Sequence, residues 1–125
     1  MPVHRQQSDY DDMVWPPDDF TGEWVVEWPN GQVKFRSLYL KGKEEGDWFC
    51  YWANGNVAQR GYHYDGESVG VWSDYWEDGV RFKETDFFSP GNFEVRWLTT
   101  EGQVREIQIF RDGCEQETKT LLPDA

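Results

Sequence analysis

Leucine, isoleucine and cysteine are scarce in this chain of 125 residues, which has five leucines, two isoleucines and two cysteines. Two cysteines do not make a disulfide framework, and two reduced thiols fit a cytoplasmic protein. No apolar run approaches the roughly 20 residues that span a bilayer. The opening MPVHRQQSDYDDM also lacks the apolar core of a signal peptide. We therefore expect a soluble, cytoplasmic protein.

Basic residues are also few, with 12 Lys and Arg against 24 Asp and Glu and a net charge of −12. Such a charge repels phosphate backbones and anionic lipid headgroups, so neither nucleic acid nor a membrane surface is an expected partner. A basic protein would be attracted instead. The simpler interpretation is that the acidity keeps an aromatic-rich chain soluble.

Motifs for catalysis are missing as well. The sequence has no Walker loop, no H-E-x-x-H, no paired C-x-x-C and no Ser–His–Asp context. His63, between two tyrosines, is expected to pack in the core or at its rim rather than act as a base. The acidic run 9–12 lacks the spacing of a calcium loop and is expected to be solvated. A glycosidase-type carboxylate pair has no fixed spacing in sequence, and nothing here favours one. We expect no enzymatic activity, no cofactor and no metal.

Aromatic residues are abundant, with eight Trp, six Tyr and eight Phe, and they recur at a fixed period. GEWVVEWPNG (22–31), GDWFCYWANG (46–55) and GVWSDYWEDG (70–79) each begin 24 residues after the previous copy. A degraded fourth copy follows, in which Gly102-Gln103-Val104 matches Gly31-Gln32-Val33. The predicted repeat domain spans 22–113, with copies at 22–45, 46–69, 70–93 and, degenerate, 94–113.

Each copy predicts a β-hairpin. The Asn-Gly or Asp-Gly dipeptides favour tight turns in which both residues adopt positive φ. Second turns are expected around 41–43 and 65–67. No segment has convincing helical periodicity. The sequence therefore predicts an all-β protein, an antiparallel hairpin meander of about eight short strands in one sheet.

One face of this sheet is expected to be lined by rings, because residues i, i+2 and i+4 of a strand share a face. Neighbouring copies would stack these rings in rows, as repeat proteins require. The predicted repeat core consists of Trp24, Trp28, Trp48, Trp52, Trp72, Trp76, Tyr39, His63 and Phe87, with Phe110 in the fourth copy. Asp74, between Trp72 and Trp76, does not fit this pattern.

The opposite face is also aromatic in the middle copies, which a solvated face does not need. Either the sheet curls enough to cover it, or the face meets a partner. The predicted protein-binding residues are Phe49, Tyr51, Tyr75, Glu27, Glu77 and Asp78.

The flanking segments differ from the repeats. Residues 1–21 combine five aspartates with Val14, Trp15 and Phe20, which predicts an acidic N-terminal arm that docks as a cap. Residues 114–125 form a polar C-terminal tail, expected as a closing strand or a loose end.

The pattern G-x-W-x-x-x-W-x-N/D-G, followed by an aromatic residue and another Gly, resembles the MORN repeat and, more specifically, its longer bacterial variant in antitoxin-like proteins. The resemblance covers 22–93 well and 94–113 poorly. It implies β-hairpins that line up into an elongated, twisted single-layer sheet. It also implies a scaffold, an interaction surface, a membrane-associated module or an antitoxin. The absence of a basic stripe argues against lipid binding by this chain.

The leading hypothesis is a non-catalytic protein-interaction module, antitoxin- or immunity-like, that binds a basic protein through an acidic, aromatic-rich surface. One alternative is a carbohydrate-binding module that uses exposed Trp and Tyr. Another is a self-assembling scaffold, with a homodimer formed through a sheet edge or a sheet face.

Overall fold

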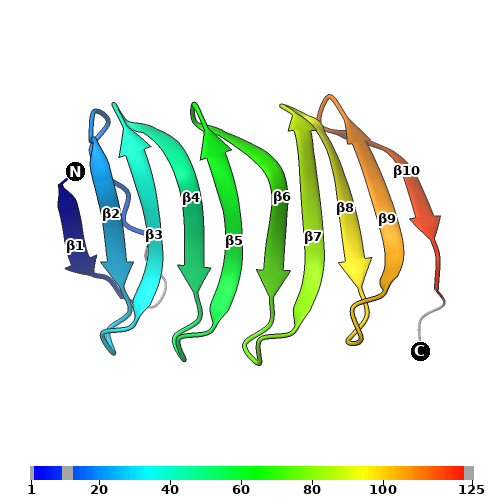
Figure 1. Ribbon diagram of the computed structural model, residues 1–125, viewed down its shortest axis with the longest axis horizontal. Helices are drawn as coiled ribbons and strands as arrows, with labels where there is room; N and C mark the ends of the chain where they lie inside the picture. The colour runs from blue at the N-terminus through cyan, green and yellow to red at the C-terminus, as the bar shows by residue number, and fades with distance from the viewer. Residues whose placement is uncertain (1, 10–12, 123–125) are drawn as a thin grey trace.

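The computed structural model describes residues 2–9 and 13–122 and contains one sheet of ten strands that follow one another in chain order (Figure 1). Tyr10, Asp11 and Asp12, part of the acidic run discussed above, lie outside the described residues. The strands are β1 (Val3–Gln7), β2 (Gly22–Glu27), β3 (Val33–Leu40), β4 (Lys43–Tyr51), β5 (Val57–Tyr64), β6 (Glu67–Tyr75), β7 (Arg81–Ser89), β8 (Asn92–Leu98), β9 (Val104–Arg111) and β10 (Cys114–Thr120).

Figure 1 shows these strands side by side along the longest axis of the molecule, in a single open layer. The described part of the chain contains no helix. From β2 to β10 every neighbouring pair is antiparallel, and β1 joins β2 in parallel. The predicted all-β hairpin meander in one sheet is confirmed, but with ten strands instead of about eight, because the N-terminal arm contributes β1 and the C-terminal tail contributes β10.

The face lined by rings, called the ring face below, holds the core. Trp24, Trp48 and Trp72 are buried there, each less than a tenth exposed. Rings from successive strands continue the row, and their centroids lie 4.5–6.1 Å apart. The contacts are Trp48–His63 (5.8 Å), His63–Trp72 (4.9 Å), Trp72–Phe87 (6.1 Å), Phe87–Phe93 (5.4 Å) and Phe93–Phe110 (4.5 Å). The row therefore extends from the second hairpin to the fourth through nearest-neighbour contacts.

The N-terminal arm covers the start of the ring face. The indole N–H of Trp24 donates to the carbonyl oxygen of Val14 at 2.8 Å. The ring of Trp15 lies 5.6 Å from that of Phe35 and 6.4 Å from that of Trp48. The arm thus buries rings of the first two hairpins, and the later hairpins have no such cover among the described residues.

The second tryptophan of each copy has a different role from the first. The strands end one residue before Trp28, Trp52 and Trp76, which therefore lie in the turns. The indole N–H of Trp28 donates to the Tyr51 carbonyl oxygen, and that of Trp52 to the Tyr75 carbonyl oxygen, both at 3.0 Å. These two tryptophans link one hairpin to the next.

Trp76 is 53 % exposed and lies outside the core, contrary to the prediction. Its ring stacks on Phe82 with centroids 3.9 Å apart. The reason is the shortened fourth copy, in which no acceptor among the described residues receives the Trp76 indole N–H.

The turns also correct the prediction. In the Asn30-Gly31 turn only the glycine has positive φ, at 89°. The Gly31 N–H donates to the Trp28 carbonyl oxygen at 2.9 Å, and the Trp28 N–H donates to the Gln32 carbonyl oxygen at 2.7 Å. This is a type I turn followed by a left-handed glycine. Pro29 supplies the fixed φ that the turn requires at its second position.

The tight two-residue turn, with both residues at positive φ, occurs instead at the other end of the hairpins. Lys41 and Gly42 have φ of 51° and 83°, and Asp65 and Gly66 have 52° and 82°. The two turn types therefore alternate along the chain. The turn with one left-handed glycine joins the two strands of a hairpin, and the two-residue turn joins one hairpin to the next.

Candidate interaction surface

The face opposite the rings, called the second face below, is built from residues that alternate with the core. One row crosses six strands through successive register partners. In order from β2 to β7 it contains Val25, Arg36, Phe49, Arg60, Ser73 and Glu84. An aromatic ring therefore lies between two arginines at the middle of this face.

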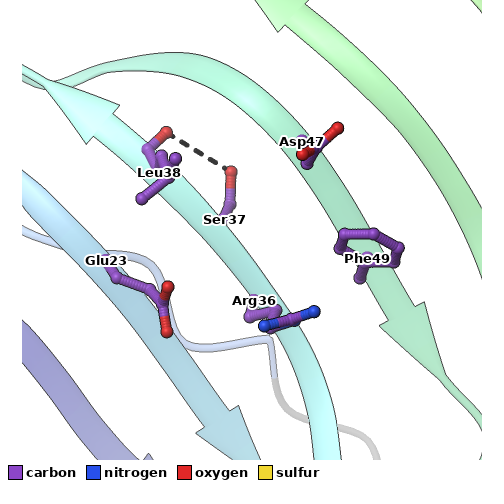
Figure 2. A pocket seen from close by; sticks show the side chains of 6 residues that line it. All are labelled: Glu23, Arg36, Ser37, Leu38, Asp47 and Phe49. Carbon is purple, nitrogen blue, oxygen red and sulfur yellow. Dashed lines mark hydrogen bonds between the residues drawn. The ribbon is translucent and has the colours of Figure 1, made fainter.

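A bulge in β4 opens a hollow on this face. Ser37 pairs with Trp48, whereas Leu38 pairs with Glu45, so Gly46 and Asp47 have no partner on β3. Gly46 accepts the irregularity because its φ is 80°. The resulting hollow has a volume of about 110 Å³. Figure 2 shows the side chains that line it, which are Glu23, Arg36, Ser37, Leu38, Asp47 and Phe49.

The same arrangement recurs one repeat later. The register between β5 and β6 shifts at the corresponding place, between Arg60 and Tyr62. A second hollow, of about 350 Å³, lies there and is lined by Asp47, Phe49, Arg60, Gly61, Tyr62 and Val71. The 24-residue period thus repeats a hollow on the surface as well as a ring in the core.

The structure gathers part of the predicted binding site on this face. Phe49 is half-buried, with the Arg36 guanidinium 4.7 Å above its ring. The Tyr51 ring stacks beside Phe49, with centroids 6.2 Å apart and planes 16° apart. Tyr75 is half-buried and lines a further hollow of about 280 Å³ with Arg60.

The predicted acidic residues lie elsewhere. Glu27 forms an ion pair with Arg5 on β1 at 3.0 Å. Glu77 and Asp78 are exposed in the turn after β6. The Asp78 carboxylate accepts the Val80 N–H at 3.0 Å, so it closes its own turn. Glu27 therefore lies beside β1, and Glu77 and Asp78 lie in the turn that follows Tyr75, outside the stacked pair Phe49 and Tyr51.

Other residues of the second face were not predicted. Leu40, Tyr64 and Phe88 are 48 %, 67 % and 59 % exposed and are separated by 24 residues each. Tyr62 and Val71, on the same face, are also about half exposed. The 24-residue period could have identified Leu40, Tyr64 and Phe88 from the sequence, because they occupy equivalent positions in successive copies.

Charge pairing on the second face is uneven. Arg96 contacts Glu84, Asp86 and Glu94 at 2.7–3.9 Å. By contrast, Arg36 and Arg60 form no ion pair with any described carboxylate. Their guanidinium groups are exposed.

Asp74, unexplained by the sequence, belongs to a polar chain on the ring face. The Trp48 indole N–H donates to the Gln59 side-chain oxygen at 3.0 Å, and the Gln59 amide donates to Asp74 at 2.9 Å. Burial raises the pKa of Asp74, and the hydrogen bond from Gln59 opposes that shift. The Asp74 carboxylate thus accepts a hydrogen bond from the Gln59 amide, and the Gln59 side-chain oxygen accepts one from the buried Trp48 indole.

A buried polar cluster lies further along the same face. His63 Nε2 is 3.0 Å from a Glu44 carboxylate oxygen, and His63 Nδ1 has no hydrogen-bond partner among the described residues. Burial lowers the pKa of His63 and raises the pKa of Glu44 and of Tyr39. His63 is wedged edge-on between the Trp48 and Trp72 rings, a packing position.

No group of three or more His, Cys, Asp or Glu side chains within residues 2–9 and 13–122 is arranged to hold a metal ion. The same residues include no helix with the length and apolar character needed to cross a membrane.

Comparison with known proteins gives one match. Residues 20–41 and 44–65, the first two hairpins, match the family described as MORN repeat variant. No curated protein and no solved structure shows a significant match to the chain. MORN repeats commonly serve as protein- or membrane-interaction modules and are generally non-catalytic. The family model matches the first two hairpins, and the 24-residue period of the sequence continues into the third.

Proposed function

We propose that the protein is a non-catalytic, cytoplasmic interaction module, antitoxin- or immunity-like, that binds a basic protein partner. The observation that carries this proposal is the net charge of −12 on a chain folded as one ten-stranded sheet. The potential of such a surface steers basic partners toward it, and aromatic side chains at its face supply anchoring contacts.

In this proposal the partner first contacts the turn after β6, called the acidic turn end below. Glu77 and Asp78 are exposed there, beside the half-buried Tyr75. Tyr51 and Phe49 continue the aromatic surface from this end toward the middle of the second face. Glu27 contributes less to attraction, because Arg5 already neutralises it.

The test is affinity capture from the native host with the wild type and with Glu77→Gln/Asp78→Asn, followed by mass spectrometry. Asn preserves the turn, because Asn30 and Asn54 accept the same backbone N–H in the first two copies. Basic proteins should be captured by the wild type, less so by the variant, and less at high salt.

The matched control removes two charges at a distant place, with Glu115→Gln/Glu117→Gln on the exposed strand β10. Capture reduced equally by both variants would show only a global charge effect and would contradict the assignment to the turn end. Partners that are not basic, or whose binding ignores salt, would contradict the proposal itself.

A carbohydrate-binding module is the second candidate, favoured by one observation. Trp76 is 53 % exposed and held flat against Phe82, which leaves an indole available to stack on a sugar ring. Titration with a glycan panel while Trp fluorescence is recorded, in the wild type and in Trp76→Leu, decides between the two. A response to a glycan that is lost in the variant supports this candidate, and no response in the wild type eliminates it.

A further inference from the structure

We infer that the second face of β3–β7 packs against the same face of a second copy, forming a two-fold symmetric β-sandwich. The starting point is the apolar surface that this face exposes. Of its residues, Leu40, Tyr62, Tyr64, Val71 and Phe88 are each between 47 % and 67 % exposed. They fall on strands β3, β5, β6 and β7 and alternate with the core residues of those strands.

The exposed area suits an interface. A large side chain offers roughly 150–250 Å² in all, so five that are about half exposed present roughly 500 Å² per copy. Two such patches give roughly 1,000 Å² before Phe49 and the charged side chains are added. A specific interface buries roughly 1,200–2,000 Å² in total. A patch of this size matches the largest that a typical monomer exposes, about 300–600 Å², and such patches are often functional.

The charges on this face select a second copy over other occupants. The chain as a whole has a net charge of −12, yet the second face carries both signs. Arg36, Lys43 and Arg60 lie among Asp47, Glu67 and Glu84 on the same five strands. A strongly basic partner that covered all five strands would be opposed by the first group, which restricts such a partner to the end of the face beside Glu77 and Asp78, and a strongly acidic one would be opposed by the second.

A two-fold axis parallel to the strands and centred over β5 gives complementary contacts. It places β3 over β7 of the second copy and β4 over β6. Each residue keeps its position along the strand direction, so residues at the same height on the two strands meet. Leu40 then meets Phe88, and Tyr64 meets its own copy. Two face-packed sheets lie roughly 10 Å apart, and interdigitating side chains of this size fill that distance.

The same axis pairs opposite charges. Lys43 on β4 faces Glu67 on β6, because the two occupy equivalent positions 24 residues apart, Lys43 paired with Leu40 and Glu67 with Tyr64. Arg36 on β3 likewise faces Glu84 on β7. In an isologous interface each of these contacts occurs twice. Arg60 lies near the axis, close to its own copy, and works against association.

Salt therefore has a characteristic effect. Two copies carry −24 in total, twice the −12 of one chain, and the contact between them is mainly apolar. Screening the repulsion should strengthen the dimer, whereas it should weaken a complex with a basic partner. The inference does not rest on the proposed function, and this opposite response keeps the two distinguishable.

The experiment is sedimentation velocity over a wide range of protein concentration, at low and at high salt. The wild type should show a concentration-dependent monomer–dimer equilibrium. Tyr64→Glu should raise the dissociation constant by about tenfold or more, because two carboxylates then meet at the axis. The matched control is Trp76→Glu, which is also about half exposed but lies off this face and should leave the constant unchanged.

A charge swap tests the geometry. Lys43→Glu and Glu67→Lys should each weaken the dimer, and the double variant should restore it, because only the double variant again pairs opposite charges. Far-UV circular dichroism and urea unfolding establish that each variant is folded. A wild type that stays monomeric, an equal effect of Trp76→Glu, a dimer that salt weakens, or a swap without restoration would each overturn the inference.

Discussion

The substitution Gly61→Ala tests how tightly the ring face is packed. A Cβ atom at residue 61 would lie 2.1 Å, 2.3 Å and 2.6 Å from three ring carbons of Trp72. Real Cβ atoms do not approach other carbons so closely, so the indole must move. Trp72 is only 8 % exposed and packs against His63 and Phe87, which leaves it little room.

The backbone adds nothing to this cost. All twelve glycines are described, and Gly61 is the one whose φ lies outside the left-handed region. At such a position Ala normally stabilises a protein by about 0.4–1 kcal/mol through the unfolded chain. Overpacking a core costs about 1–3 kcal/mol. We therefore expect net destabilisation of about 1–2 kcal/mol, which lowers the melting temperature by roughly 4–8 °C.

Urea unfolding of the wild type, Gly61→Ala, Trp72→Leu and the double variant measures the effect. Leu lacks the benzo ring, so Gly61→Ala should cost at least about 1 kcal/mol less in that background. A stabilising effect of Gly61→Ala in the wild type would refute the steric reasoning. An equal cost in both backgrounds would show that Trp72 is not the residue displaced.

Two further predictions concern the buried histidine and the turn tryptophans. Burial lowers the pKa of His63, so the stability that its neutral form contributes is present above the unfolded pKa of about 6.5 and is lost as the pH falls below it. As the pH is lowered from about 7 to about 5, the urea stability of His63→Phe should therefore rise relative to that of the wild type. A difference between the two that does not depend on pH would contradict this. Trp52→Phe keeps a ring but removes the hydrogen bond to the Tyr75 carbonyl oxygen and should cost about 1 kcal/mol. Trp76→Phe, with no such bond to lose, should change the unfolding free energy by less than about 0.5 kcal/mol, and equal effects of the two would refute the linking role.

Much of the fold follows from short-range patterns in the sequence. Strand alternation places Trp24, Trp48 and Trp72 on one face, because that pattern depends only on the period of two within a strand. The repeat then brings equivalent residues together without any knowledge of distant contacts. The hairpin sheet was predictable for these reasons.

The candidate site was less predictable, because it depends on where strands end and shift register. The turn after β2 uses Pro29 and a left-handed Gly31, which takes Trp28 out of the strand and away from the core row. The bulge at Gly46 and Asp47 opens a hollow that no alternation pattern contains. Both effects arise from pairing between strands.

The sequence by itself determined the 24-residue period, the all-β hairpin architecture and the ring face, because each follows from local backbone preferences repeated along the chain. Only the tertiary structure decided that Trp28 and Trp52 link hairpins, that the arm lays Trp15 over Trp48, and that Arg36 and Arg60 flank Phe49. These features depend on contacts between residues far apart in the chain, whose geometry is fixed only when the strands pair.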